Sequence, residues 1–241
     1  MTCMYERTTR IEKDVGEYEQ IRCSVVRKFE VKTRGIEIDS VPGVDLWKFP
    51  YPSNFSDVGE LHISTHQVLY IPTGISIFFP NLKDLSVINC GLKELKQNDM
   101  KSFPDLKFLL LFGNAVEVLE KDLFKFNPKL VIIDMNMNNL KHIDAHVFDH
   151  LNGLGSLNFA GNLCITLSMT GPEGVKEVID EIRKRCQNFG ALGGKKKIVI
   201  EGKQRGKYFW IFVGCGIITG IFSICAFARI AFGIVKGCGS P

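Results

Sequence analysis

Five histidines are the residues whose chemistry could support a metal site, and three of them are regularly spaced. His142, His146 and His150 lie four residues apart, a spacing that would place imidazole ligands on one face of a helix. A 24-residue period in the surrounding sequence instead assigns them to the turn and outer arc of one coil. His62 and His66 belong to a degenerate coil, where surface and turn positions are expected. The sequence therefore predicts solvated histidines and no metal site.

Motifs for catalysis and for phosphate binding are also missing. The sequence has no G-x-S-x-G, no glycine-rich phosphate loop and no paired-cysteine metal motif. Residues 1–182 contain 19 Lys and Arg against 25 Asp and Glu, so nucleic acid is not an expected ligand. We expect a non-enzymatic protein that uses no cofactor.

The chain is organised around a repeat with a period of 24 residues that runs from Leu82 to Cys164. Each unit starts with a leucine that follows a short turn: Leu82, Leu106, Leu130 and Leu154. Apolar residues recur three, five and ten positions later: Leu85, Leu109, Ile133 and Leu157; Val87, Leu111, Met135 and Phe159; Leu92, Val116, Leu140 and Cys164. Eight positions after the first leucine, which we call the eighth position, each unit has a cysteine or an asparagine: Cys90, Asn114, Asn138 and Asn162. This is the L-x-x-L-x-L-x-x-N/C-x-L signature of leucine-rich repeats.

The repeat predicts an α/β leucine-rich-repeat solenoid with parallel strands on its concave face. A weaker unit at 58–81 brings the total to about five coils. The eighth-position residues should form a ladder that bonds the backbone as it leaves each strand, with each rung worth about 1 kcal/mol. Because one coil cannot bury its own apolar face, the coils must stack.

The residues two, four and six positions after the first leucine of each unit should point outward on the concave face. In the three central coils these are Asp84, Ser86 and Ile88; Phe108, Leu110 and Phe112; and Ile132, Asp134 and Asn136. The middle set, Phe108, Leu110 and Phe112, is apolar. Its inward-facing neighbours Leu109 and Leu111 are also apolar, so this strand is apolar on both sides. Contiguous exposed apolar surface is typical of an interaction site, so we expect a protein partner here. The alternative is that a capping segment covers these residues.

Segments with other patterns flank the repeats. Residues 1–57 are expected to cap the N-terminal end of coils 58–163, with a strand predicted from the alternation over 23–31. Residues 164–189 should form a C-terminal cap helix, with apolar residues at helical spacing after Thr170. Cys164 and Cys186 would then either form a disulfide or remain two buried thiols.

The C-terminal part reads as a membrane anchor. A basic linker at 190–207 precedes 208–228, which is 21 residues long and uncharged, and a short tail at 229–241 follows. We expect 208–228 to cross a lipid bilayer. Gly216 and Gly220 form a G-x-x-x-G, which would permit a homodimer.

The sequence contains conflicting signals for the side of the membrane on which the repeats lie. Six Lys and Arg at 195–207 precede the span, and residues 1–16 have no apolar segment typical of a signal peptide, which favours a cytosolic, tail-anchored protein. The cysteines and the Asn54-Phe-Ser56 glycosylation sequon favour the extracellular side.

Tyr70–Gly74, Phe79–Leu82, Phe103–Leu106 and Phe126–Leu130 carry a resemblance to secreted or membrane-bound leucine-rich-repeat proteins of flies and midges. The resemblance extends loosely over residues 3–188. It implies a Cys3–Cys23 pair at the mature start, a cysteine-capped C-terminal end and a signal-encoding segment outside this sequence. We therefore expect a single-pass protein with extracellular repeats that acts in adhesion, recognition or as a co-receptor. An intracellular tail-anchored scaffold is the alternative.

Overall fold

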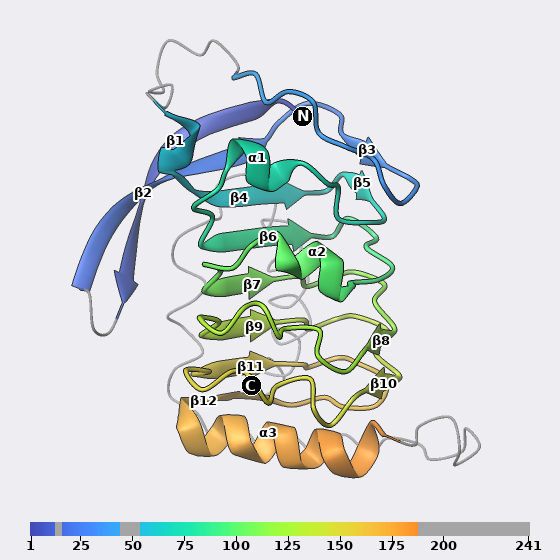
Figure 1. The fold of residues 1–241 in the computed structure, drawn as a ribbon. Coiled ribbons are helices and arrows are strands. Elements are labelled where there is room, and N and C mark those ends of the chain that lie inside the picture. The colour runs from blue at the N-terminus through green and yellow to red at the C-terminus, as the bar shows by residue number, and fades with distance from the viewer. Residues whose placement is uncertain (13–15, 44–53, 188–241) are drawn as a thin grey trace, which may run out of the picture. The chain divides into compact units, whose positions relative to one another are not determined.

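The structure is a computed structural model that describes residues 1–12, 16–43 and 54–187. The chain divides into two compact units, Met1–Lys195 and Lys196–Pro241, and every described residue belongs to the first. Its main sheet has the order β1-β2-β4-β6-β7-β9-β11-β12 (Figure 1). The strands are β1 Cys3–Glu12, β2 Gly16–Val25, β4 Val58–Ser64, β6 Asp84–Ile88, β7 Phe108–Leu110, β9 Ile132–Asp134, β11 Ser156–Asn158 and β12 Ser168–Thr170.

The repeat sets the register of the five parallel strands β4, β6, β7, β9 and β11, which delimit about four complete turns of a solenoid. Leu61 pairs with Leu85, Leu85 with Leu109, Leu109 with Ile133 and Ile133 with Leu157. All five of these side chains are fully buried, so the core runs through the solenoid as a column of equivalent positions. The degenerate stretch at 58–81 forms the first turn.

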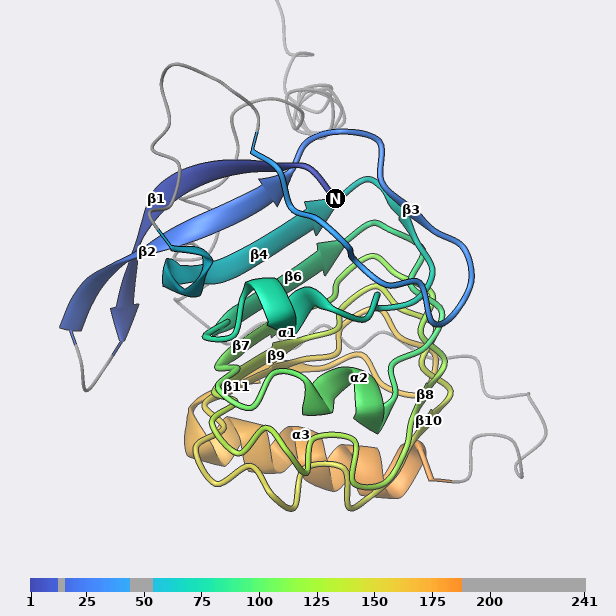
Figure 2. The ribbon, with the colours of Figure 1, turned by 45° about the horizontal axis from the view of Figure 1, so that its top comes forward.

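Short elements close the far side of the turns, apart from η1 Phe55–Asp57, which directly precedes β4 (Figure 2). They are β3 Glu30–Val31, β5 Gln67–Val68, α1 Ile75–Phe78, α2 Gln97–Lys101, β8 Val118–Leu119 and β10 His142–Ile143. Buried aromatic rings fill the space behind the sheet, with the Phe124 and Phe148 centroids 6.5 Å apart and those of Phe148 and Phe159 6.0 Å apart. This packing fixes the strands that carry the outer face.

An antiparallel hairpin of β1 and β2 caps the N-terminal end. Only the second half of β2 pairs with β4, starting at Ile21 opposite Val58, with a register shift between Ile21 and Arg22. The end of β1 and the beginning of β2 project past the beginning of β4 and β6 (Figures 1 and 2). The predicted strand at 23–31 is wrong in its limits, because β2 ends at Val25 and the exposed residues 26–28 separate it from β3.

The C-terminal end is covered by α3, Gly171–Arg185, which packs Val175, Val178 and Ile182 against the last turn. Its basic final turn, Arg183 to Arg185, complements the negative end of the helix dipole. Strand β12 pairs antiparallel with β11 and leads directly into this helix.

None of the described helices is both long and apolar enough to span a bilayer. The predicted linker 190–207, span 208–228 with Gly216 and Gly220, and tail 229–241 all lie outside the described residues.

Candidate functional site

The candidate site is the outer face of the sheet, formed by the outward positions of β4, β6, β7, β9 and β11. Along β7, the side chain of Leu109 is fully buried while those of Phe108 and Leu110 are half-buried, so the strand alternates as predicted. Ile88, Phe112 and Ile132 are also half-buried. We call Ile88, Phe108, Leu110, Phe112 and Ile132 the apolar patch.

Two of the residues expected to be accessible on this face are covered. Asp84 is 0% exposed and Ser86 2% exposed, so neither is available to a partner in this conformation. The expectation of exposure is wrong for both. Asp84 is covered because Arg10 and Gln20 of the N-terminal hairpin bond its carboxylate, and Ser86 lies between its strand neighbours His62 and Leu110.

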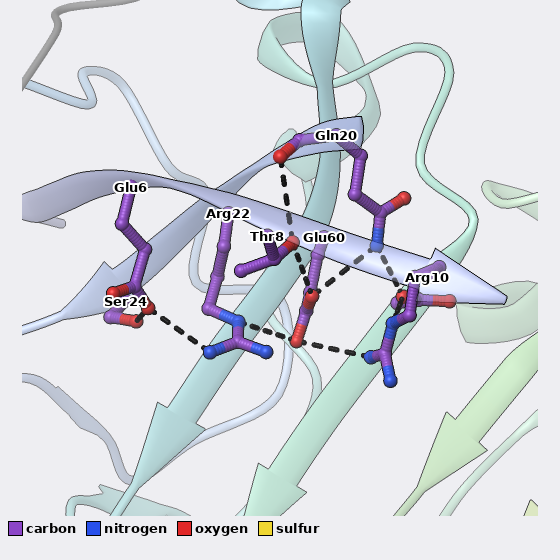
Figure 3. Close-up of polar contacts among 8 residues, drawn as sticks. Glu6, Thr8, Arg10, Gln20, Arg22, Ser24 and Glu60 are labelled. Atoms are coloured by element: carbon purple, nitrogen blue, oxygen red, sulfur yellow. Dashed lines mark hydrogen bonds and ion pairs between the residues drawn. The ribbon is translucent and has the colours of Figure 1, made fainter. Parts of the chain in front are cut away.

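A buried polar network joins the hairpin to the sheet (Figure 3). Arg10 on β1 donates from Nε to Asp84 Oδ2 at 2.9 Å, and its Nη2 lies 3.3 Å from Glu60 Oε1. Gln20 on β2 donates from Nε2 to Asp84 Oδ2 at 2.6 Å and to Glu60 Oε2 at 3.3 Å. Arg22 Nε lies 2.6 Å from Glu60 Oε1. Thr8 Oγ1 also donates to Glu60 Oε2 at 3.3 Å, so Arg10 and Gln20 bridge both carboxylates while Arg22 and Thr8 contact Glu60.

The network shifts the titration of its members. Desolvation by burial raises the pKa of Asp84 from 3.8 to about 6, and Glu60 adds to the rise, although Arg10 and Gln20 oppose it. Burial also acts on Arg22, but its hydrogen bonds and charge interactions with Glu60 and Glu6 dominate, and its pKa is raised. His62, also on β4, has its pKa lowered by burial and by the charge of Arg22. The Arg22 guanidinium therefore stays charged, whereas the raised pKa of Asp84 favours its neutral form in mildly acidic solution.

A second, smaller polar cluster lies on β9 and β11, at the far side of the apolar patch. Asp134 Oδ1 accepts from the backbone N–H of Asn136 at 3.0 Å, and its Oδ2 accepts from Asn158 Nδ2 at 3.1 Å. The carboxylate is half-buried and held by amides rather than by a cation.

The eighth-position residues form a hydrogen-bonded ladder behind the strand ends. Asn138 Nδ2 donates to the carbonyls of Leu111 at 2.9 Å and Met135 at 3.1 Å, and its Oδ1 accepts from Val116 N at 3.1 Å. Asn114 and Asn162 repeat this pattern one turn away on either side. Cys90 makes weaker contacts, from its thiol to the carbonyls of Ile63 at 3.6 Å and Ile88 at 3.2 Å. The ladder holds the apolar patch through its backbone, since Cys90 contacts the carbonyl of Ile88 and Asn114 that of Phe112 at 3.3 Å.

Disulfides close both ends of the solenoid. Cys3 pairs with Cys23 across the hairpin, with Cα atoms 5.2 Å apart, and Cys164 pairs with Cys186 at the end of α3, with Cα atoms 5.1 Å apart. Cys90 is a free, buried thiol. Asn54 is exposed and caps η1, where its Oδ1 accepts from Ser56 N at 3.0 Å.

The histidines do not converge on a metal site. His146 Nδ1 lies 2.8 Å from Asp149 Oδ2, and His150 Nε2 lies 3.3 Å from Asp122 Oδ1. His66 Nε2 contacts the carbonyl of Val25 at 3.1 Å. Within the described ranges, no group of His, Cys, Asp and Glu side chains is arranged to hold a metal ion.

Sequence reasoning missed one periodic feature of this face. The residue just before each ladder position has a positive φ: Thr65 at 59°, Asn89 at 52°, Gly113 at 70°, Met137 at 53° and Gly161 at 70°. The pattern could have been found from the glycines at 113 and 161 and the asparagine at 89, which favour this conformation. Met137 is unusual here, because it combines the strained backbone with a side chain that is 67% exposed.

Comparison with known proteins agrees with the repeat architecture. Residues 104–163 match the family model described as leucine rich repeat. A 93-residue part of the chain is 32% identical to part of the human volume-regulated anion channel subunit LRRC8B. The match covers 38% of this chain and only 12% of LRRC8B. Together with the parallel-strand solenoid, these matches support a leucine-rich-repeat protein.

Proposed function

We propose that this protein is a non-enzymatic binding protein that captures a protein partner on the outer face of its sheet through the apolar patch. The observation that carries the proposal is strand β7, in which Phe108 and Leu110 stay half-buried although the inward positions already fill the core. Leucine-rich-repeat domains generally bind proteins, and exposed aromatic side chains are the usual anchors of such interfaces.

The patch has polar groups on both sides, as protein interfaces commonly do. Glu60 and Asp84 lie on one side, already paired with the hairpin, and Asp134 lies on the other. A partner with apolar side chains and basic neighbours fits this arrangement, because the half-buried Asp134 would attract a cation while the patch buries apolar area.

The repeats are proposed to lie outside the cell, anchored by residues 208–228 in a bilayer. Two disulfides and the exposed Asn54 support this placement, since disulfides persist in oxidising compartments and the sequon requires an accessible asparagine. In this role the protein would act in adhesion, recognition or as a co-receptor. Pairing of two copies through Gly216 and Gly220 is part of the same proposal.

A cytosolic, tail-anchored scaffold is the second candidate, favoured by the six basic residues that precede the span. Occupancy of Asn54 by a glycan in protein from its own cells separates the two. A glycosylated Asn54 supports the extracellular protein, whereas an unmodified Asn54 together with reduced Cys3, Cys23, Cys164 and Cys186 supports the scaffold.

Site-specific photo-crosslinking tests the binding face. A photoreactive amino acid replaces Phe112 in the full chain, and a matched variant carries it at Ile77, an apolar residue on α1 that is 71% exposed. We expect a discrete cross-linked protein from position 112 only. Equal cross-linking from both positions, or none from either, would contradict the proposal.

A further inference from the structure

Glu60, Asp84 and Phe108 occupy adjacent outward positions on β4, β6 and β7. Glu60 pairs with Asp84 in the strand register, and Asp84 pairs with Phe108. The guanidinium of Arg10 reaches all three, since it contacts both carboxylates and lies 5.4 Å from the centroid of the Phe108 ring. A planar cation that donates to carboxylates and stacks on an aromatic face is the specific chemistry of arginine. We call Glu60, Asp84 and Phe108 the guanidinium seat.

Arg10 does not satisfy the seat completely. Asp84 Oδ1 and Gln20 Oε1 are buried and have no hydrogen-bond partner among the described residues. Arg10 gives one contact to each carboxylate instead of a two-bond fork to either, and its side chain remains 28% exposed. A buried carboxylate oxygen without a donor is costly, so the seat favours a better-placed guanidinium.

The segment that holds Arg10 is attached to the sheet differently from the rest of the hairpin. We call residues 7–12 and 16–20 the strap. The backbone pairing between β2 and β4 begins only at Ile21, directly at the register shift, and the Cys3–Cys23 disulfide holds the other half of the hairpin. The strap contacts the solenoid through side chains: Thr8, Arg10 and Gln20 on the carboxylates, and Tyr18 beneath Lys83 with 5.1 Å between the ammonium and the ring centroid.

Because the backbone pairing with β4 starts at Ile21, this residue is where the strap would pivot. Lifting it would break these side-chain contacts while the ladder from Ile21 onward and the disulfide keep the N-terminal cap in place. A partner arginine could replace the contacts of Arg10 in kind, because its guanidinium can donate to both carboxylates and stack on the Phe108 ring.

We propose that the guanidinium seat is the specificity site of the outer face, filled in cis by Arg10, and that the protein partner binds by inserting an arginine that displaces Arg10 as the strap lifts. This inference rests on the proposed function and specifies the chemistry of the partner. Phe108 belongs both to the seat and to the apolar patch, so the incoming arginine is followed by apolar side chains that cover Leu110 and Phe112.

Two measurements on the full chain test the seat and the strap. The first is the binding of L-argininamide by calorimetry or NMR to the wild-type protein and to Arg10→Ala, with lysinamide as a probe of equal charge. The second is amide hydrogen exchange over 7–12 and 16–20 in Arg10→Ala and in the control Arg7→Ala. Arg7 lies on the same strand, and among the described residues its side chain makes one exposed ion pair, at 3.5 Å with Glu19.

We expect argininamide to bind Arg10→Ala at least about ten-fold more tightly than the wild type, with no such gain for lysinamide. Exchange in the strap should accelerate at least about ten-fold in Arg10→Ala and stay close to wild type in Arg7→Ala, while the amides of β4 and β6 remain protected. Equal gains for both amides, or strap exchange that matches the Arg7→Ala control, would overturn the inference.

These outcomes are separable from those for the proposed function. If position 112 captures a partner but Arg10→Ala leaves that capture unchanged, the seat fails and the binding face stands. If argininamide occupies the emptied seat but no partner cross-links at position 112, the seat stands and the proposed function fails.

Discussion

Asp84 shows how strongly one buried residue couples the hairpin to the sheet. Its carboxylate is fully buried, faces Glu60 across the strand pair, and depends on Arg10 and Gln20 for its hydrogen bonds. A buried acid pair of this kind is stable only while its cationic partners stay in place, because an unpaired buried charge is strongly destabilising.

The raised pKa of Asp84 predicts an unusual pH dependence. Because its pKa is about 6 in the folded protein and 3.8 as an ordinary aspartate, protonation stabilises the folded state. This contribution is complete below about pH 4 and is lost as pH rises through 6. In urea unfolding, the wild type should gain up to roughly 3 kcal/mol relative to Asp84→Asn between pH 7 and pH 4. Parallel stability curves for the two proteins would contradict this.

Met137 provides a second test at the scale of one residue. Its φ of 53° is unfavourable for a non-glycine side chain, and the side chain is largely exposed, so little packing is lost on removing it. Met137→Gly should raise the free energy of unfolding by about 0.5–1 kcal/mol. The control Asn89→Gly should gain less, since asparagine tolerates this conformation. Loss of stability in Met137→Gly would show that the side chain is a packing residue.

At the scale of elements, the asparagine ladder connects each strand end with the preceding turn. Asn138→Ala leaves the N–H of Val116 without its partner and removes one of two side-chain donors from the carbonyls of Leu111 and Met135, which keep Asn114 and Asn162, so chemical denaturation should show a loss of about 2–3 kcal/mol. Asn136 bonds outward to Asp134, and Asn136→Ala should cost about 1 kcal/mol or less. Similar losses at both positions would mean that the ladder has no special role.

The C-terminal cap depends on its disulfide as well as on the buried face of α3. The Cys164–Cys186 bridge closes a separation of 22 residues, so replacing both cysteines with serine should lower stability by about 2–4 kcal/mol. Amide exchange should accelerate first in α3 and β12. An unchanged unfolding midpoint would indicate that Val175, Val178 and Ile182 hold the helix without the bridge.

Prediction from the sequence succeeded for elements whose environment repeats. Leu85, Leu109 and Ile133 occupy equivalent positions, so a period of 24 residues was enough to place their strands and buried sides. The burial of Asp84 could not be predicted, because it results from contact with Arg10, 74 residues away in a segment outside the repeat. The strand predicted at 23–31 failed for a related reason: alternation in the sequence does not show where a cap leaves the sheet.

For the molecule as a whole, the two ends of the solenoid differ. The C-terminal end is closed by a packed helix and a disulfide, whereas the N-terminal hairpin extends past the strand ends and brings Arg10 and Gln20 onto the outer face. The apolar patch lies between these ends, on strands fixed by the core and the ladder. The hairpin covers Glu60 and Asp84 beside the apolar patch. This arrangement suits selective binding, because only a partner that can replace the hairpin contacts reaches both the patch and these two carboxylates.

The most direct test of the central claim is the affinity of Phe112→Ser for the partner that cross-links at position 112, compared with Ile77→Ser and with thermal melting of each variant. We predict that Phe112→Ser weakens binding by at least about thirty-fold, as expected for an aromatic anchor, with nearly unchanged melting. Ile77→Ser should bind as the wild type does. Undiminished binding by Phe112→Ser, or a large loss of its thermal stability, would contradict the assignment of the apolar patch as the binding surface.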